Sequence, residues 1–61
     1  MNYLIEVSII EIEEQQQKEA YNRVYNSTGE YFDEAYIKVT NEISNKKPNS
    51  IVKLNYYTEQ L

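Results

Sequence analysis

VYNSTGEYF, residues 24–32, fits two incompatible structures, and each of them implies a different fold class for the chain. Asn26 and Gly29 suit the first and last positions of a type I β-turn, which would make NSTG the turn of a hairpin. Ser27 followed by Glu30 also matches the capping box that begins a helix. Both structures require a sharp chain reversal within NSTG, so the residues that follow must distinguish between them.

The residues after this stretch favour the helix. Apolar side chains recur at the spacing of one helical face, at Phe32, Ala35, Tyr36, Val39 and Ile43. Lys46 and Lys47 follow where the helix dipole is negative, and Pro48 ends the pattern. We therefore predict an α+β fold, in which a helix near residues 28–45 packs on one face of a small sheet. The alternative is an all-β meander with a hairpin turn at residues 26–29.

Both ends of the chain have the apolar–polar alternation of strands. In the first ten residues, the apolar set on one parity is Tyr3, Ile5, Val7 and Ile9. The parity changes near Ile9 and Ile10, which predicts a β-bulge or a strong twist there, or else a strand covered on both faces at its middle. The alternation in residues 51–60 predicts a last strand with one face formed by Val52, Leu54 and Tyr56. Tyr57 then lies on the opposite face.

Residues 13–26, EEQQQKEAYNRVYN, fit either type of element. Glu, Gln, Lys and Ala are strong helix formers, and this favours a helix slightly. The segment AYNRVYN, residues 20–26, also suits an exposed strand. Two terminal strands alone would make an unstable sheet, so more strands must come from residues 20–26 or from a second copy of the chain. If the terminal strands are parallel neighbours, their crossover should be right-handed.

Length and composition indicate one small domain that needs support from outside. A chain of 61 residues buries about 60% of its unfolded surface, so its stability alone should be marginal. It has no Cys and no His, which excludes disulfides and the common zinc sites. We therefore expect a homo-oligomer or docking on a larger partner. No apolar run is long enough to span a membrane and no signal peptide is recognisable, so a cytoplasmic location is expected.

The charge is negative overall and unevenly distributed. The net charge is −4, and up to Glu34 there are eight acidic side chains against two basic ones. Nucleic-acid binding needs clustered Lys and Arg, so direct binding of DNA or RNA is not expected. The acidic first half would instead be attracted to a basic surface on a protein, although acidic residues also serve solubility alone.

The residue types that usually carry catalysis are missing. Without His and Cys, the chain lacks the commonest general base, the thiol nucleophile and the soft metal ligands. Neighbouring carboxylates at Glu13–Glu14 and Asp33–Glu34 usually form a solvated face instead of an acid–base pair. A single Gly excludes a glycine-rich phosphate loop. We predict that the protein is not an enzyme and has no metal or cofactor site.

Tyrosine is the most informative residue type. Seven Tyr are more than so small a core can bury, and Tyr is enriched at protein interfaces. We expect Tyr3 and Tyr36 in the core. The predicted partner-binding residues combine the acids with the other Tyr: Glu13, Glu14, Glu19, Tyr21, Tyr25, Glu30, Tyr31, Asp33, Glu34 and Tyr57.

These features predict a non-enzymatic acidic, tyrosine-rich interaction module that docks on a basic surface of a larger protein. Ile, Asn, Tyr and Lys, whose codons are AT-rich, make up 26 of the 61 residues, which suggests a low-GC genome. A short acidic protein from such a genome could belong to a bacteriophage or other mobile element. The natural role there would be inhibition of a host enzyme or defence protein. The alternatives are a self-assembling homo-oligomer and an oligomer that binds a nucleotide-like ligand between Tyr rings.

Overall fold

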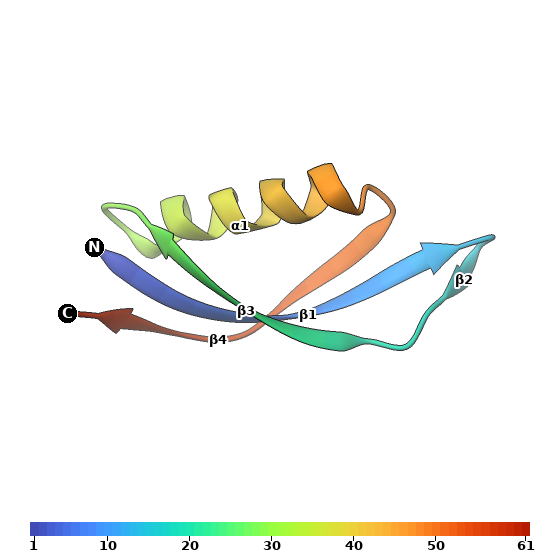
Figure 1. Cartoon of the computed structure of the whole chain (residues 1–61), viewed down its shortest axis with the longest axis horizontal. Coiled ribbons are helices and arrows are strands. Elements are labelled where there is room, and N and C mark those ends of the chain that lie inside the picture. Colours follow the sequence, from blue (N-terminus) through green and yellow to red (C-terminus); the bar gives the residue numbers. More distant parts are fainter.

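The computed structural model describes the whole chain, residues 1–61, and has one helix on one face of an antiparallel sheet (Figure 1). The elements in chain order are β1 (Asn2–Glu13), β2 (Gln16–Gln17), β3 (Tyr21–Thr28), α1 (Phe32–Lys46) and β4 (Ser50–Gln60). β1 lies between β3 and β4, while β2 pairs with the end of β1. The predicted α+β fold is confirmed. The terminal strands are neighbours but antiparallel, so the condition for a right-handed crossover is not met.

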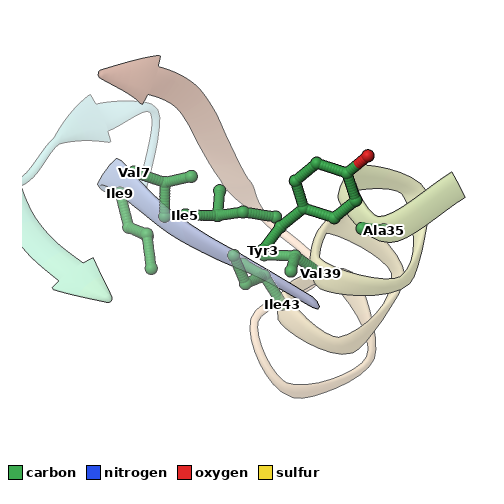
Figure 2. Close-up of a cluster of buried hydrophobic side chains, with 7 residues drawn as sticks. All are labelled: Tyr3, Ile5, Val7, Ile9, Ala35, Val39 and Ile43. Atoms are coloured by element: carbon green, nitrogen blue, oxygen red, sulfur yellow. The ribbon is translucent and has the colours of Figure 1, made fainter. Parts of the chain in front are cut away.

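The core forms between β1 and the apolar face of α1 (Figure 2). Alternation along β1 turns four side chains toward the helix, where three helix side chains meet them. These buried residues are Tyr3, Ile5, Val7, Ile9, Ala35, Val39 and Ile43. Phe32 and Tyr36 are half-buried against this cluster, so the whole predicted stripe of α1 faces the sheet. Full burial of each large aliphatic side chain contributes about 1.5–3 kcal/mol to folding.

β4 contains a β-bulge at Asn55. Between Glu6 and Val7 the register to β4 shifts by one residue, so that Asn55 has no partner on β1. Because of this extra residue, Tyr57 lies on the helix side of the sheet and Tyr56 on the open side. The predicted faces of these two Tyr are therefore wrong.

β1 itself is regular, so the bulge predicted at Ile9 and Ile10 is wrong. Ile9 is buried under the helix, while Ile10 lies half-buried on the open face. The irregularities lie in the strands that pair with β1. One is the bulge in β4. The other lies between β2 and β3, where residues 18–20 face only residues 10 and 11 of β1 and therefore include one extra residue.

β1 and the β2–β3 segment form a long hairpin with Glu14 and Gln15 at its tip. Both residues have positive φ, 51° and 65°, as a type I′ turn requires of its two central residues. The slight preference for a helix in residues 13–26 is therefore wrong, and the strand alternative for residues 20–26 is correct. Helix propensity is a weak preference, whereas pairing with β1 satisfies the backbone groups on one side of β3 and brings Tyr21 and Tyr25 against the core.

The stretch 24–32 joins β3 to α1 without a hairpin turn. β3 continues through Thr28, and the chain reverses at residues 29–31. α1 begins at Phe32, so the helix is confirmed, although it starts later than predicted. The predicted capping box is wrong, because the N-cap is Tyr31 and no side chain caps the first turn.

Ser27 and Gly29 nevertheless hold the start of α1 against the sheet. The Ser27 hydroxyl donates a 2.9 Å hydrogen bond to the carbonyl of Ala35. It therefore contacts α1 as a donor, whereas a cap would accept a hydrogen bond from a backbone N–H. At Gly29, an added Cβ would lie 2.8 Å from the nitrogen of Ala35 and 2.9 Å from the carbonyl oxygen of Tyr31. This close approach of backbone leaves no room for a side chain at Gly29.

Candidate functional site

The predicted partner-binding acids fall into two groups at opposite ends of the molecule. The residues around β2 are Glu13, Glu14 and Glu19. The residues around the start of α1 are Glu30, Asp33 and Glu34, with Tyr31 among them. The two groups lie at the two ends of the longest axis, which extends 41 Å, so they do not form one surface (Figure 1).

The group at the start of α1 keeps its carboxylates free. Glu30, Asp33 and Glu34 are exposed, and none of them belongs to an ion pair within the chain. Asp33 and Glu34 occupy the first turn, where the helix dipole favours negative charge by about 0.3–1 kcal/mol each. Stabilisation of α1 is therefore one role of these acids, and it leaves their outer side open to a partner.

Glu59 joins this end of the molecule from β4. It is paired with Tyr3 on the neighbouring strand. Burial raises the pKa of the Tyr3 hydroxyl, and the negative charges of Glu59 and Glu34 raise it further. Glu59 was not among the predicted site residues, because its place at this end depends on strand register, for which the sequence has no local signal. We call the set Glu30, Tyr31, Asp33, Glu34 and Glu59 the acidic end.

An aromatic cluster adjoins the acidic end. Phe32 stacks on Tyr57 with the ring centroids 3.7 Å apart, and on Tyr36 at 5.4 Å. Tyr3 meets Phe32 edge-on at 5.9 Å. Tyr57 remains 47% exposed and Tyr31 remains 66% exposed. Partly exposed aromatic rings next to carboxylates form a surface of the kind that protein interfaces favour.

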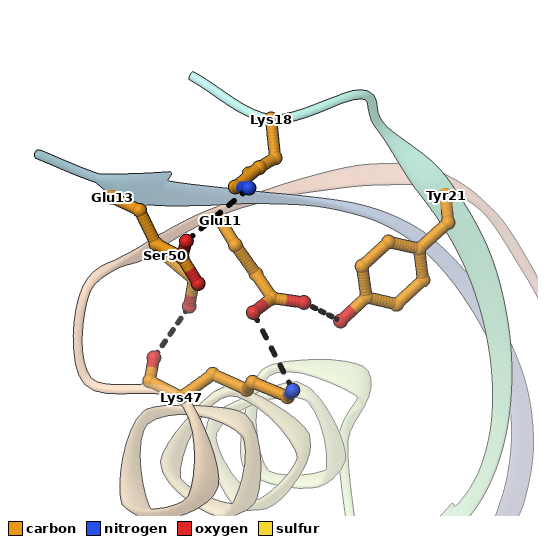
Figure 3. A network of polar contacts seen from close by, with 6 residues as sticks. All are labelled: Glu11, Glu13, Lys18, Tyr21, Lys47 and Ser50. Carbon is orange, nitrogen blue, oxygen red and sulfur yellow. Dashed lines mark hydrogen bonds and ion pairs between the residues drawn. The ribbon is translucent and has the colours of Figure 1, made fainter. Parts of the chain in front are cut away.

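The acids near the hairpin tip are partly neutralised by lysines (Figure 3). The Tyr21 hydroxyl donates a 2.9 Å hydrogen bond to one carboxylate oxygen of Glu11, and the Lys47 ammonium lies 3.4 Å from the other. Lys18 pairs with Glu13 at 3.2 Å. The hydrogen bond from Tyr21 lowers the pKa of Glu11 and the charge of Lys47 lowers it further, whereas partial burial opposes both effects. These contacts hold Glu11 and Glu13, whereas Glu14 and Glu19 are exposed and have no ion-pair partner within the chain.

Tyr21 and Tyr25 line a hollow beside the last turn of α1, away from the acidic end. The hollow has a volume of about 150 Å³, and its lining residues are Ile9, Tyr21, Arg23, Tyr25, Ile43, Lys46 and Lys47. The guanidinium carbon of Arg23 lies 5.7 Å from the centroid of the Tyr21 ring. We call this the basic hollow. This hollow was not predicted from the sequence, because the placement of β3 next to α1 is a tertiary feature.

No side chains converge as a metal centre or a buried acid–base pair would require. No group of three or more His, Cys, Asp or Glu side chains is placed to hold a metal ion. No charged side chain is buried, and no buried polar side-chain atom lacks a hydrogen-bond partner. The helix is neither long nor apolar enough to cross a membrane. The features with functional potential are therefore the acidic end, the basic hollow and the free edges of the sheet.

No family model, curated protein or solved structure matches this chain. Its function is therefore inferred from the chemistry of its own surface.

Proposed function

We propose that the protein is a non-enzymatic interaction module that docks its acidic end on a basic surface of a larger protein. The observation that carries the proposal is the combination of free carboxylates and exposed tyrosine at the start of α1. Glu30, Asp33 and Glu34 have no ion-pair partner within the chain, and Tyr31 among them is 66% exposed. The hairpin tip is a weaker candidate, because lysines already pair with some of its acids.

Binding would begin with electrostatic attraction. Clustered carboxylates steer a basic surface toward the acidic end, and salt weakens this attraction by screening. Tyr31 and Tyr57 would then supply apolar contact area with a hydroxyl at the rim. Because Tyr57 is already held by its stack on Phe32, ordering this ring at an interface costs little additional side-chain entropy.

In its most specific form, the proposal is inhibition of a protein that binds nucleic acid. The Lys and Arg side chains that neutralise phosphates also attract carboxylates, so the acidic end would compete with DNA or RNA for such a site. The amino-acid composition, rich in residues whose codons are AT-rich, supports a phage or mobile-element origin, in which the target is a host enzyme or defence protein in the cytoplasm. The lack of His and Cys supports a role without catalysis.

Binding of a nucleotide-like ligand in the basic hollow is the second candidate. Arg23, Lys46 and Lys47 would attract a phosphate there, and Tyr21 and Tyr25 would offer rings for stacking. The hollow of about 150 Å³ is smaller than the pockets of about 300–1,000 Å³ that hold such ligands. Lys47 is also held by Glu11 at 3.4 Å. We therefore rank this function below docking.

Two triple variants with the same change of charge test the docking proposal. The acidic-end variant is Glu30→Gln, Asp33→Asn and Glu34→Gln. The matched tip variant is Glu13→Gln, Glu14→Gln and Glu19→Gln. Circular dichroism confirms that both variants are folded, and proteins retained from a host lysate by the tagged wild-type chain are identified by mass spectrometry and purified. The affinity of each purified partner for the three chains is then measured by calorimetry at low and high salt.

We expect the acidic-end variant to bind about tenfold more weakly, and the tip variant to bind nearly as tightly as the wild type. The affinity of the wild type should fall as salt is raised. Equal losses in the two variants would mean that net charge alone matters. Either that result or a salt-independent affinity contradicts docking through the acidic end.

A further inference from the structure

β4 is an edge strand with one side unpaired along its length. It pairs with β1 on one side and with no strand on the other. Such an edge presents a row of free N–H and C=O groups to any strand that approaches it. No Pro interrupts β4, and its central residues 54–57 carry no charge. Of the features that prevent pairing with another chain, this edge has the bulge at Asn55 and one lysine, Lys53, but no Pro and no charge at its centre.

The other free edge, on β3, is guarded by charged side chains. Arg23 projects from β3, and Lys38 and Glu42 of α1 border the hollow between the helix and this strand. The Lys38 ammonium also donates a 2.8 Å hydrogen bond to the carbonyl of Thr28. Charged groups at an edge discourage the addition of a strand. β4 lacks this cover, because α1 packs over β1 and β3.

The helix-facing side of β4 is only partly buried within one chain. Val52 and Leu54 are half-buried, and Tyr57 is 47% exposed. These three side chains form an apolar strip next to the free edge. A strand that pairs with this edge would therefore meet both unpaired backbone groups and apolar side chains.

We propose that β4 pairs with β4 of a second copy of this chain, antiparallel and about a two-fold axis. The two sheets then become continuous, and both helices lie on the same face. A two-fold interface is self-complementary, so every contact occurs twice. This arrangement would supply the outside support that a chain with seven buried residues of 61 is expected to need.

The β-bulge selects the register of this pairing. Leu54, before the bulge, and Tyr57, after it, both face the helix although they are three positions apart. Residues that lie opposite each other in a sheet must point to the same face. The register that satisfies this rule on both sides of the bulge places Leu54 opposite Tyr57 of the second copy. The bulges at Asn55 then meet at the two-fold axis.

The charges along β4 complement each other in this arrangement. β4 itself carries Lys53 in its first half and Glu59 near its far end. Antiparallel pairing brings the half with Lys53 in one copy beside the half with Glu59 in the other, twice by symmetry. On the open face, the same register sets Lys53 opposite Thr58 of the second copy.

Charge variants at Thr58 test both the edge and the register. Thr58→Glu places a carboxylate opposite Lys53 of the second copy, and Thr58→Lys places a like charge there. Thr58 is exposed, so both variants should remain folded. We expect the dimer dissociation constants of the two variants, measured by sedimentation equilibrium at low salt, to differ by about tenfold in favour of Thr58→Glu. High salt should reduce this difference.

Asn26 provides a matched control. Leu4 on β1 pairs with Thr58 on one side and with Asn26 on the other, so the two positions are equivalent except for the edge that they occupy. Asn26→Glu and Asn26→Lys should leave the dissociation constant unchanged. Sensitivity at Asn26 instead of Thr58 would assign the interface to β3. The proposal is overturned by that outcome. It is also overturned if the dimer is insensitive to charge at both positions, or if the chain is a monomer at millimolar concentration.

Cysteine cross-linking gives a second readout, because the natural chain has no Cys. A mixture of the single variants Lys53→Cys and Thr58→Cys should form a disulfide-linked heterodimer under mild oxidation. A mixture of Asn26→Cys with Lys53→Cys should form little of the corresponding product. Equal yields from the two mixtures count against the register. All these variants keep Glu30, Asp33 and Glu34, so failure of the dimer is distinguishable from failure of docking.

Discussion

Phe32 and Tyr57 stack with their ring centroids 3.7 Å apart and their planes inclined by 17°. This contact joins the first residue of α1 to β4, which otherwise touches the helix little. It exists because the bulge at Asn55 turns Tyr57 toward the helix, where regular alternation would have placed Tyr56. One extra residue in β4 thus decides which Tyr packs against the helix.

The stack should be measurable by a double-mutant cycle with Phe32→Leu and Tyr57→Leu. Leucine keeps much of the apolar area and removes the ring–ring contact, so we expect a coupling free energy of about 0.5–1.5 kcal/mol in urea unfolding. Tyr56→Leu on the open face is the control and should change the free energy of unfolding by about 0.5 kcal/mol or less. A coupling free energy near zero would show that the ring–ring contact adds no stability beyond the apolar area that leucine also buries.

Deletion of Asn55 should leave the fold intact. Without this residue, Leu54 and Tyr57 still face the helix and Tyr56 still faces the open side, because the bulge is the only interruption of the alternation. We expect a loss of about 1 kcal/mol in the free energy of unfolding, since the Asn55 amide donates a 2.8 Å hydrogen bond to the Ser8 hydroxyl. Urea unfolding and an amide NMR spectrum check the prediction.

Deletion of Lys53 is the control for this prediction. The chain would then keep its pairing only by turning Leu54 to the open face and Asn55 toward the helix. Loss of the apolar contact and burial of an amide should together cost about 2–3 kcal/mol. If the two deletions destabilise the protein equally, the bulge does not set the faces of β4.

Acid should weaken the native state partly through Glu11. The pKa of Glu11 lies below its ordinary value of 4.5, chiefly because the Tyr21 hydroxyl donates a hydrogen bond to it. A carboxylate with a depressed pKa stabilises the native state above its unfolded pKa, and this contribution is lost as the pH falls through the folded pKa. The free energy of unfolding of Tyr21→Phe should therefore fall less than that of the wild type between about pH 5 and pH 2.

Tyr25→Phe on the same strand serves as the control for the acid prediction. It removes a hydroxyl without touching Glu11, so its free energy of unfolding should follow the pH dependence of the wild type. Urea titrations at each pH provide the measurement. If Tyr21→Phe and Tyr25→Phe show the same pH dependence, the Tyr21–Glu11 hydrogen bond is not linked to stability.

The hairpin tip should be improved by glycine. Gln15 has a φ of 65°, and a left-handed conformation costs a residue with a Cβ about 1–2 kcal/mol. Glycine avoids this cost but loses more backbone entropy, so Gln15→Gly should stabilise the protein by about 0.5–1 kcal/mol in urea unfolding. Gln16→Gly within β2 should instead destabilise it by a similar amount. A destabilising Gln15→Gly would be inconsistent with the type I′ turn.

Local patterns predicted the elements but not all of their ends. The stripe from Phe32 to Ile43 identified α1, because helical spacing of apolar residues is visible within one segment. The start of α1 was predicted too early, since Ser27 and Glu30 match a capping box that the chain does not use. β3 competes for Ser27 through its pairing with β1, and this pairing outweighs a cap of about 1 kcal/mol.

The acids at the start of α1 could be proposed from sequence because they are neighbours in the chain. Glu30, Asp33 and Glu34 stay together in any fold that places a turn before the helix. Glu59 could not be added to them, because it arrives through the pairing of β4 with β1. Tyr21 was assigned to the acidic surface, whereas the register of β3 places it at the basic hollow.

Local spacing along the chain is enough to predict strands at both ends, a helix with one apolar face, and a cluster of acids at the start of that helix. These features depend on a few helical turns or strand positions, because any fold that buries the apolar side chains gains free energy from the same spacing. The bulge at Asn55, the side of the sheet on which Tyr57 lies, and the separation of the acids into two ends are known only from the folded chain. Each of these depends on the register between strands, which is set by contacts summed over the whole sheet and helix.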